Sequence, residues 1–173
     1  MIIIADNAAH IVKRINDIWG KKPGKKTLQK LVYLIQQKGI NLNYDYGIHF
    51  YGPYSEKLDH AITSMSADGV IEFDYSGRSH LMGIKTEAFE VKPKELSEEQ
   101  QHVIDDLITQ FEGYSPSDLE LLTTAIYAYE HLDDKSRASI INGVKKIKGS
   151  KYSQEQIEQS LQNFEYFNKR IAN

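Results

Sequence analysis

Apolar residues recur at every third or fourth position through most of this chain, but at every second position in one short stretch. Helical spacing covers residues 4–19, 27–38 and 55–67, and it resumes from residue 97 onward. Alternation covers "IEFDY" at 71–75, and the turn-forming "SGRS" follows directly. The change of period predicts a mainly α protein with a small β-hairpin, in the order three helices, the hairpin, then four helices.

Helix-start signals support the C-terminal helices. "SEEQ" at 97–100 and "SQEQ" at 153–156 have a serine followed three residues later by a glutamine, which is capping-box spacing. "SPSD" at 115–118 places a proline at the first helical position, where its missing N–H has no consequence. The segment "LELLTTAIYAYEHL" at 119–132 is apolar on most sides, so we expect it at the centre of the core.

Three helices followed by a hairpin is the element order of a winged helix-turn-helix. We therefore expect a winged-helix-like N-terminal half over residues 1–92, packed on a C-terminal helical half over residues 93–173. The segment "KPKELS" at 92–97 is the expected joint. Apolar helices on both sides of it predict that the two halves pack as one globular unit.

The composition limits the kinds of site that the chain can build. It contains no cysteine, which removes disulfides, thiolate zinc sites and thiol nucleophiles. Its apolar fraction is typical of globular proteins. No apolar run is long enough to span a bilayer and no signal peptide is recognised, so we expect a soluble, cytoplasmic protein.

Charge weighs against DNA reading by the third helix. Glu56 and Asp59 would lie on its exposed face and repel phosphates, whose neutralisation supplies most non-specific affinity. The hairpin adds two more carboxylates against the single Arg78. DNA binding therefore stands as the alternative function, that of a winged-helix transcriptional regulator, with these candidate contacts: Lys21, Lys22, Lys25, Lys26, Lys30 and Arg78.

Catalytic motifs are not found. None of the six histidines is spaced three or four residues from another on one predicted helix, and neither HExxH nor GxSxG occurs. "GKKPGKKT" lacks the order of a P-loop. We therefore predict no metal, no cofactor and no enzymatic activity. A small enzyme that uses His49 and the nearby tyrosines for acid–base chemistry is a second alternative.

The stretch "YDYGIHFYGPYSEKL" at 44–58 concentrates aromatic residues where no regular helix can form. We expect Gly52 and Pro53 to turn the chain and Ser55 to cap the next helix. The aromatic side chains would then pack around this corner.

Three segments together carry a resemblance to a known family: "KKTLQKLVYLIQQKGI" (25–40), "IHFYGPYSEKL" (48–58) and "LELLTTAIYAY" (119–129). They resemble the YwgA-like group of bacterial proteins. More distantly, they are similar to the Panacea (SocA-like) antitoxin superfamily, in which a "KLQKLLY"-like helix precedes an aromatic–x–x–GP turn. The matching residues are Leu28, Gln29, Lys30, Leu31, Tyr33, Gly52 and Pro53. Tyr54 departs from the superfamily, which often has a small β-branched residue there.

The Panacea resemblance implies a non-catalytic regulatory protein that binds another protein, such as a toxin or a regulatory partner. Gln29, Lys30 and Tyr33 are unusual choices for packing alone, and their spacing makes them neighbours on one helix. The alternative is that these side chains bond to the backbone of the turn. The candidate partner-binding residues are Gln29, Lys30, Tyr33, His49, Tyr51 and Tyr54.

Overall fold

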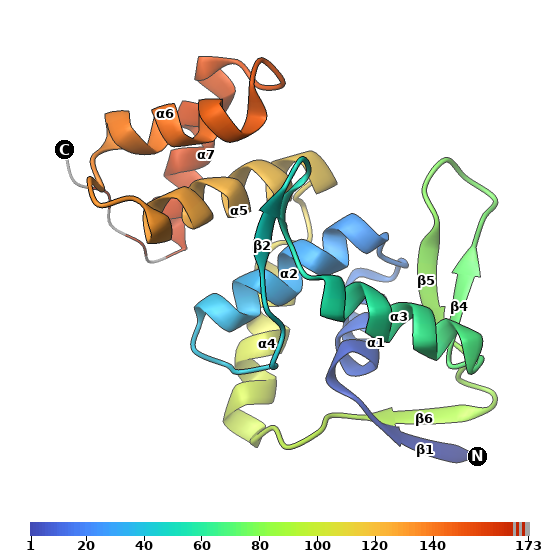
Figure 1. Cartoon of the computed structure of the whole chain (residues 1–173). Helices are drawn as coiled ribbons and strands as arrows, with labels where there is room; N and C mark the ends of the chain where they lie inside the picture. The colour runs from blue at the N-terminus through green and yellow to red at the C-terminus, as the bar shows by residue number, and fades with distance from the viewer. Residues whose placement is uncertain (168, 170, 172–173) are drawn as a thin grey trace. The chain divides into compact units, whose positions relative to one another are not determined.

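The computed structural model describes residues 1–167, 169 and 171. Its helices are α1 (Asn7–Trp19), α2 (Lys25–Gln37), α3 (Glu56–Ala67), α4 (Glu98–Gln110), α5 (Pro116–His131), α6 (Arg137–Lys148) and α7 (Gln154–Tyr166) (Figure 1). Its strands are β1 (Ile2–Ala5), β2 (Gly47–His49), β3 (Gly52–Tyr54), β4 (Ile71–Asp74), β5 (Leu81–Ile84) and β6 (Phe89–Lys92). The prediction of a mainly helical protein with small β elements is confirmed.

The predicted capping boxes are present. Ser97 pairs with Gln100 at the start of α4, and Ser153 pairs with Gln156 at the start of α7. A third box joins Ser115 to Asp118 at the start of α5, with Pro116 in the first turn. These local signals could be read from the sequence because each depends on residues at most three positions apart.

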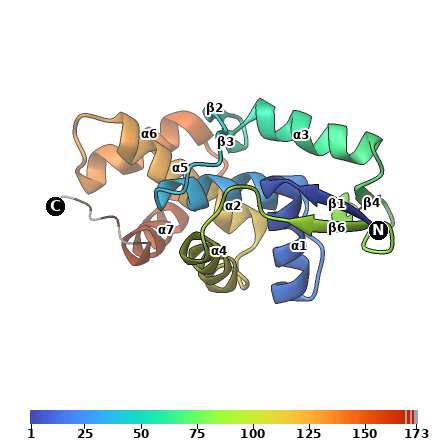
Figure 2. The same ribbon diagram turned by 90° about the horizontal axis from the view of Figure 1, so that it is seen from below.

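The N-terminus and the number of strands differ from the prediction. The first helix was expected to begin at residue 4, but residues 2–5 form β1, which pairs in parallel with β6 from Ile2 with Phe89 to Ala5 with Lys92 (Figure 2). Helix α1 begins only after Asp6, whose carboxylate accepts the Ala9 N–H at 2.9 Å. A strand whose partner lies more than 80 residues away leaves no local sequence signal.

The chain divides into two compact units. Unit 1 comprises residues 1–46 and 55–113, and unit 2 comprises residues 47–54 and 114–173. This division differs from the expected one at residue 93, because α4 packs on α1 inside unit 1. The Arg14 guanidinium binds Asp105 at 2.9 Å, and Trp19 Nε1 donates to the Ile108 carbonyl at 2.7 Å.

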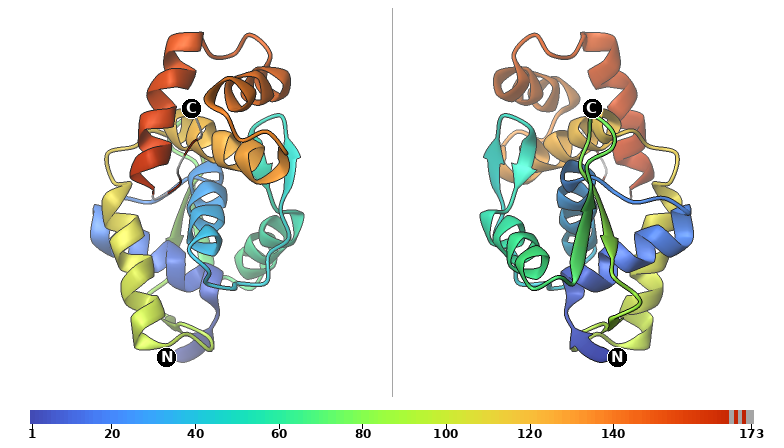
Figure 3. Two further views of the ribbon diagram at one scale, coloured as in Figure 1. Left: turned by 90° about the vertical axis from the view of Figure 1, so that its left-hand side faces the viewer. Right: turned by 90° about the vertical axis from the view of Figure 1, so that its right-hand side faces the viewer.

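In unit 1 the antiparallel hairpin β4–β5 packs beside α1 and α3 (Figure 3). The loop between α1 and α2 adds to it, because Gly24 bridges Leu81 and Met82 N donates to the Pro23 carbonyl at 2.8 Å. The winged-helix arrangement of this unit stays a prediction.

In unit 2 the short hairpin β2–β3 lies against α5, which also packs on α6 and α7 (Figure 1). Phe50 and Tyr51 form the turn of this hairpin, and Gly52 begins β3. Gly52 has a φ of 89°, and a Cβ atom there would lie 2.8 Å from Thr124 Oγ1. Glycine is therefore required both by the backbone conformation and by the close approach to α5.

No helix within the described residues is long and apolar enough to cross a membrane.

Replacing Gly52 with alanine should lower the free energy of unfolding by about 2–4 kcal/mol, since it adds both left-handed backbone strain and a clash with Thr124. Gly47→Ala in the same hairpin is the control, because a Cβ atom at Gly47 has no neighbour within 4 Å. Urea unfolding followed by circular dichroism measures both variants. Equal stability of the two would contradict the packing described for Gly52.

Candidate functional site

Two large aromatic side chains stand exposed at the turn of the β2–β3 hairpin. Phe50 is 67% exposed and Tyr51 is 58% exposed. Their ring centroids lie 5.1 Å apart with the planes at 87°. Turns usually carry small polar residues, so a pair of solvent-facing rings at this position is unusual.

The hairpin register explains why these rings face outward. Gly47 pairs with Tyr54, Ile48 with Pro53, and His49 with Gly52, which leaves a loop of two residues. The close approach of Gly52 to α5 fixes the base of the hairpin. The two loop side chains are thereby directed away from the core.

Lys151 lies beside this aromatic pair. Its ammonium nitrogen is 5.7 Å from the Phe50 ring centroid, 5.1 Å from that of Tyr51 and 5.5 Å from that of Tyr152. Each distance falls within the range of a cation–π contact. The site therefore combines exposed aromatic faces with a positive charge.

A buried carboxylate holds this lysine in place. The Glu120 side chain is fully buried in α5, and its oxygens accept from Lys151 Nζ at 2.8 and 3.0 Å. Lys148 Nζ, also buried, lies 3.1 Å from Glu120 Oε2, and the Tyr152 hydroxyl donates to the same carboxylate. Buried charges of this kind are tolerated only when they are paired.

The same network fixes the hairpin backbone, because Lys148 Nζ donates to the Phe50 carbonyl at 2.7 Å. Burial, followed by the hydrogen bond to Glu120, raises the pKa of Tyr152 well above its usual range, so its hydroxyl remains a donor. We define the tip cluster as this set of side chains: Phe50, Tyr51, Glu120, Lys148, Lys151 and Tyr152.

The tip cluster carries a local excess of positive charge. Lys148 and Lys151 together bring two positive charges to the single carboxylate of Glu120. Lys145 and Lys146 extend the charge along the last turn of α6, and Lys146 is exposed. The tip cluster and the end of α6 are therefore basic and aromatic, although the whole chain has a net charge of −3.

Three of the predicted partner-binding residues lie inside unit 1. Gln29, Lys30 and Tyr33 are 5%, 1% and 4% exposed. The Gln29 amide forms two hydrogen bonds of 2.9 Å with the backbone of Ser55. This arrangement matches the alternative in which these side chains bond to the backbone of the turn. The Tyr33 ring packs edge-on against Tyr46 at 5.1 Å. Their part in partner binding stays a prediction.

The other three predicted residues lie in the hairpin of unit 2. Tyr51 belongs to the tip cluster, and the rings of His49 and Tyr54 pack 4.8 Å apart. His49 is exposed, which gives little support to an enzyme built around it. Of the predicted structural residues, Gly52 and Pro53 start β3, and Ser55 Oγ accepts the Leu58 N–H at 3.2 Å to cap α3.

The lysines proposed for DNA binding are spread over different environments in unit 1. Lys21 Nζ lies 5.7 Å from the Trp19 ring, and Lys22 packs against Gly83 of β5. Lys25 pairs with Asp59 at 3.4 Å. Lys26 lies in the first turn of α2, Lys30 is buried, and Arg78 is exposed in the β4–β5 turn.

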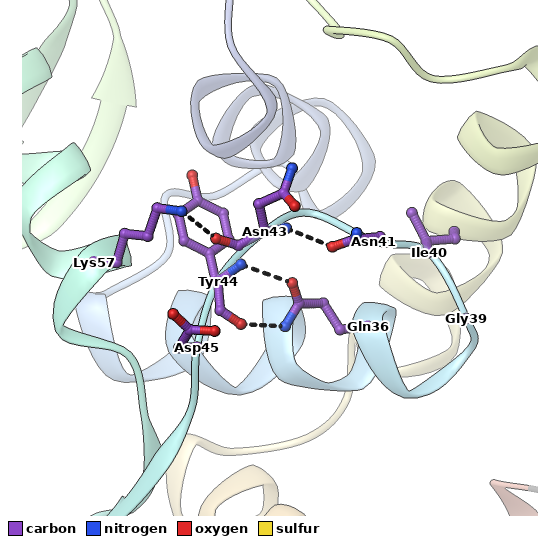
Figure 4. Close-up of a pocket in the computed structure, with 8 residues that line it drawn as sticks. All are labelled: Gln36, Gly39, Ile40, Asn41, Asn43, Tyr44, Asp45 and Lys57. Carbon is purple, nitrogen blue, oxygen red and sulfur yellow. Dashed lines mark hydrogen bonds between the residues drawn. The ribbon is translucent and has the colours of Figure 1, made fainter.

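A polar pocket of about 490 Å³ lies in unit 1, beside the loop that follows α2 (Figure 4). Both ends of the Gln36 amide bond to the loop: Nε2 donates to the Tyr44 carbonyl at 2.9 Å, and Oε1 accepts from the N–H groups of Leu42 and Tyr44. Lys57 Nζ donates to the Asn43 carbonyl at 2.6 Å. Because these groups already hold the loop, we assign the pocket a structural role.

A second pocket, of about 290 Å³, lies in unit 2. The first turns of α5 form one side of it, and residues spread along α7 form the other. We call it the α5–α7 groove, and its lining includes Ser117, Asp118, Leu121, Glu155, Gln159 and Ser160. Ser160 is 5% exposed, and its hydroxyl has no hydrogen-bond partner among the described residues.

Sequence reasoning missed most of the tip cluster. The one sequence signal for this cluster was Glu120, a charged residue within a helix predicted to be buried on most sides. A buried charge needs a partner, so Glu120 could have indicated that cations lie nearby. Its partners Lys148, Lys151 and Tyr152 lie about 30 residues further along, in a stretch that resembles an ordinary basic helix end. Within the described residues, no cluster of three or more histidines and carboxylates could hold a metal.

No family model matches the chain. It is 26% identical to the uncharacterised protein YwgA of Bacillus subtilis over 159 residues, which cover 91% of this chain and 93% of YwgA. The predicted resemblance to YwgA is confirmed. The likeness to the Panacea superfamily stays a prediction.

The chain is also 28% identical, over 134 residues, to a DNA ADP-ribosyl glycohydrolase of Thermus aquaticus. The match covers 70% of this chain but only 34% of that relative, so the chain corresponds to about a third of its length. The prediction that the protein is not an enzyme is wrong in the light of this relationship. It rested on short catalytic motifs, and such motifs do not reveal sites assembled from distant segments.

Glu120→Gln should destabilise the protein by about 3–5 kcal/mol, because it leaves the buried Lys148 without its counter-charge. Glu165→Gln is the matched control: its ion pair with Arg137 is exposed and should contribute less than about 1 kcal/mol. Urea unfolding of the two variants gives the comparison. A small effect at Glu120 would show that the network does not hold the tip cluster.

Ser160→Ala should stabilise the protein by about 1 kcal/mol, because a buried hydroxyl without a partner is unfavourable. Ser64→Ala on the exposed face of α3 controls for the higher helix preference of alanine, a gain of about 0.5 kcal/mol or less. Thermal unfolding compares them. A loss of stability in Ser160→Ala would show that this hydroxyl has a partner.

Proposed function

We propose that this chain takes part in the enzymatic removal of ADP-ribose from DNA, and that its tip cluster binds unstacked nucleotides of the DNA strand. The observation that carries the proposal is the exposed pair Phe50 and Tyr51 beside Lys151. The name of the Thermus aquaticus relative supplies the substrate class.

Exposed aromatic rings are the usual means by which proteins bind single-stranded nucleic acids. Stacking of a base on such a ring contributes about 1–3 kcal/mol and depends little on which base is bound. The rings of Phe50 and Tyr51 present faces in two directions because their planes are nearly perpendicular. A strand could therefore place bases on either ring at the same turn.

The lysines supply the complementary charge. Lys151 lies between the aromatic rings and the Glu120 carboxylate, and Lys146 extends the positive charge along α6. Contacts with phosphates make binding depend on salt concentration. The acidic residues elsewhere in the chain would limit non-specific binding, so we expect moderate affinity that is strongest at low salt.

Unit 1 offers a second DNA surface if the winged-helix arrangement holds. The bridge from Gly24 to Leu81 supports it, because a winged helix pairs the segment between its first two helices with its last strand. Lys21, Lys22 and Arg78 would then contact phosphates.

Binding of a protein partner, as an antitoxin would do, is the second candidate function. The observation in its favour is that aromatic residues dominate the binding energy of protein interfaces, and Phe50 and Tyr51 are of this type. The experiment that follows separates it from DNA binding.

Fluorescence anisotropy with a short labelled oligothymidine at low salt tests the proposal. The double variant Phe50→Ala, Tyr51→Ala should bind at least about tenfold more weakly, since it loses one or two stacking contacts. Tyr166→Ala is the matched control, because this tyrosine is 78% exposed in the same unit but lies outside the tip cluster.

Equal binding by the double variant and the unaltered protein would overturn the role of the tip cluster. No binding by the unaltered protein at low salt would overturn DNA recognition itself. In that case the protein-partner function becomes the better explanation of the exposed aromatic residues.

A further inference from the structure

The α5–α7 groove has the chemistry of a site for a neutral, hydroxyl-rich ligand. Asp118 and Glu155 bring carboxylates to it from the first turns of α5 and α7, and Gln159 adds an amide. Leu121 supplies an apolar surface of the kind that packs against the C–H face of a sugar ring. Two carboxylates disfavour a phosphate in the groove, since like charges repel at short range.

Ser160 is the observation that points to a ligand. This residue forms part of the wall of the groove and is only 5% exposed. Its hydroxyl has no hydrogen-bond partner among the described residues. Buried hydroxyls are nearly always hydrogen-bonded in proteins. The Ser160 oxygen has almost no solvent-accessible surface, so a polar group that enters the groove would bond to it only after a small shift of the groove wall.

Carboxylates are the groups that proteins commonly use to bind the adjacent hydroxyls of a ribose. We propose that the α5–α7 groove binds a ribose ring through its free 2′ and 3′ hydroxyls. The choice of ribose rests on the proposed function, because ADP-ribose carries such hydroxyls while the deoxyribose of DNA lacks the 2′ hydroxyl. The groove would therefore distinguish the ADP-ribosyl group from the DNA that bears it.

The groove meets the tip cluster at Tyr152. This side chain lines the groove, while its hydroxyl donates to Glu120 and its ring lies 5.5 Å from Lys151 Nζ. All of these residues belong to unit 2. A single modified nucleotide strand could therefore contact the tip cluster with its bases and the groove with its ribose.

A titration of ¹⁵N-labelled protein with methyl β-D-ribofuranoside at millimolar concentrations tests the proposal by NMR. The amide signals of residues 117–121 and 155–163 should shift, and the corresponding 2-deoxyribofuranoside should shift them much less. Equal shifts with the two sugars, or no shift with the ribofuranoside, would overturn the proposal.

Glu155→Gln should weaken binding of the ribofuranoside by at least about fivefold, a loss of roughly one strong hydrogen bond. This residue lies outside the capping box of α7, so the helix should keep its start. Glu158→Gln, an exposed carboxylate on α7 outside the groove, is the matched control and should bind normally. Ser160→Ala should also bind more weakly while it stays folded, and normal binding by both groove variants would overturn the assignment.

Failure of the two proposals can be told apart. The Phe50→Ala, Tyr51→Ala variant leaves the groove intact, so it should bind the ribofuranoside as the unaltered protein does. Binding of the riboside without any binding of oligothymidine would overturn the proposed DNA contact and support the groove. Binding of oligothymidine without the riboside would overturn the groove alone.

Discussion

The architecture of unit 2 depends on one buried carboxylate. Glu120 is fully enclosed in α5, and the groups that neutralise it come from the end of α6 and the loop before α7. A buried charge without partners would be strongly unfavourable, so the helices can pack in this arrangement only when Lys148 and Lys151 reach Glu120. Lys148 then also binds the Phe50 carbonyl, which extends the network into the β2–β3 hairpin.

This dependence explains how exposed aromatic residues can hold a defined position. A two-residue loop with large side chains has few internal contacts of its own. Here the Phe50 backbone is fixed by Lys148, the base of the hairpin by the contact between Gly52 and Thr124, and the rings by the neighbouring Lys151 ammonium. A recognition surface that is ordered in advance loses less entropy on binding.

The sequence was a good guide wherever structure depends on near neighbours. The helices, the capping boxes at Ser97 and Ser153, and the alternation in β4 all follow from residues within one or two turns of each other. It was a poor guide to pairings at long range, such as β1 with β6 or Glu120 with Lys151. Gln29 shows a case between the two: its polar side chain allowed either a binding face or bonds to the turn, and the structure shows its amide bonded to the backbone of Ser55, 26 positions away.

The hairpin at 47–54 has a consequence for the order in which the chain can fold during synthesis. It is encoded inside the segment that forms unit 1, yet it belongs to unit 2, whose helices begin only after residue 113. Domains tend to fold as they leave the ribosome, N-terminal parts first. The hairpin must therefore wait, with Phe50 and Tyr51 uncovered, until Glu120 and Lys148 have been made. For the same reason, cutting the chain after residue 113 would yield two fragments, neither of which carries all of unit 2.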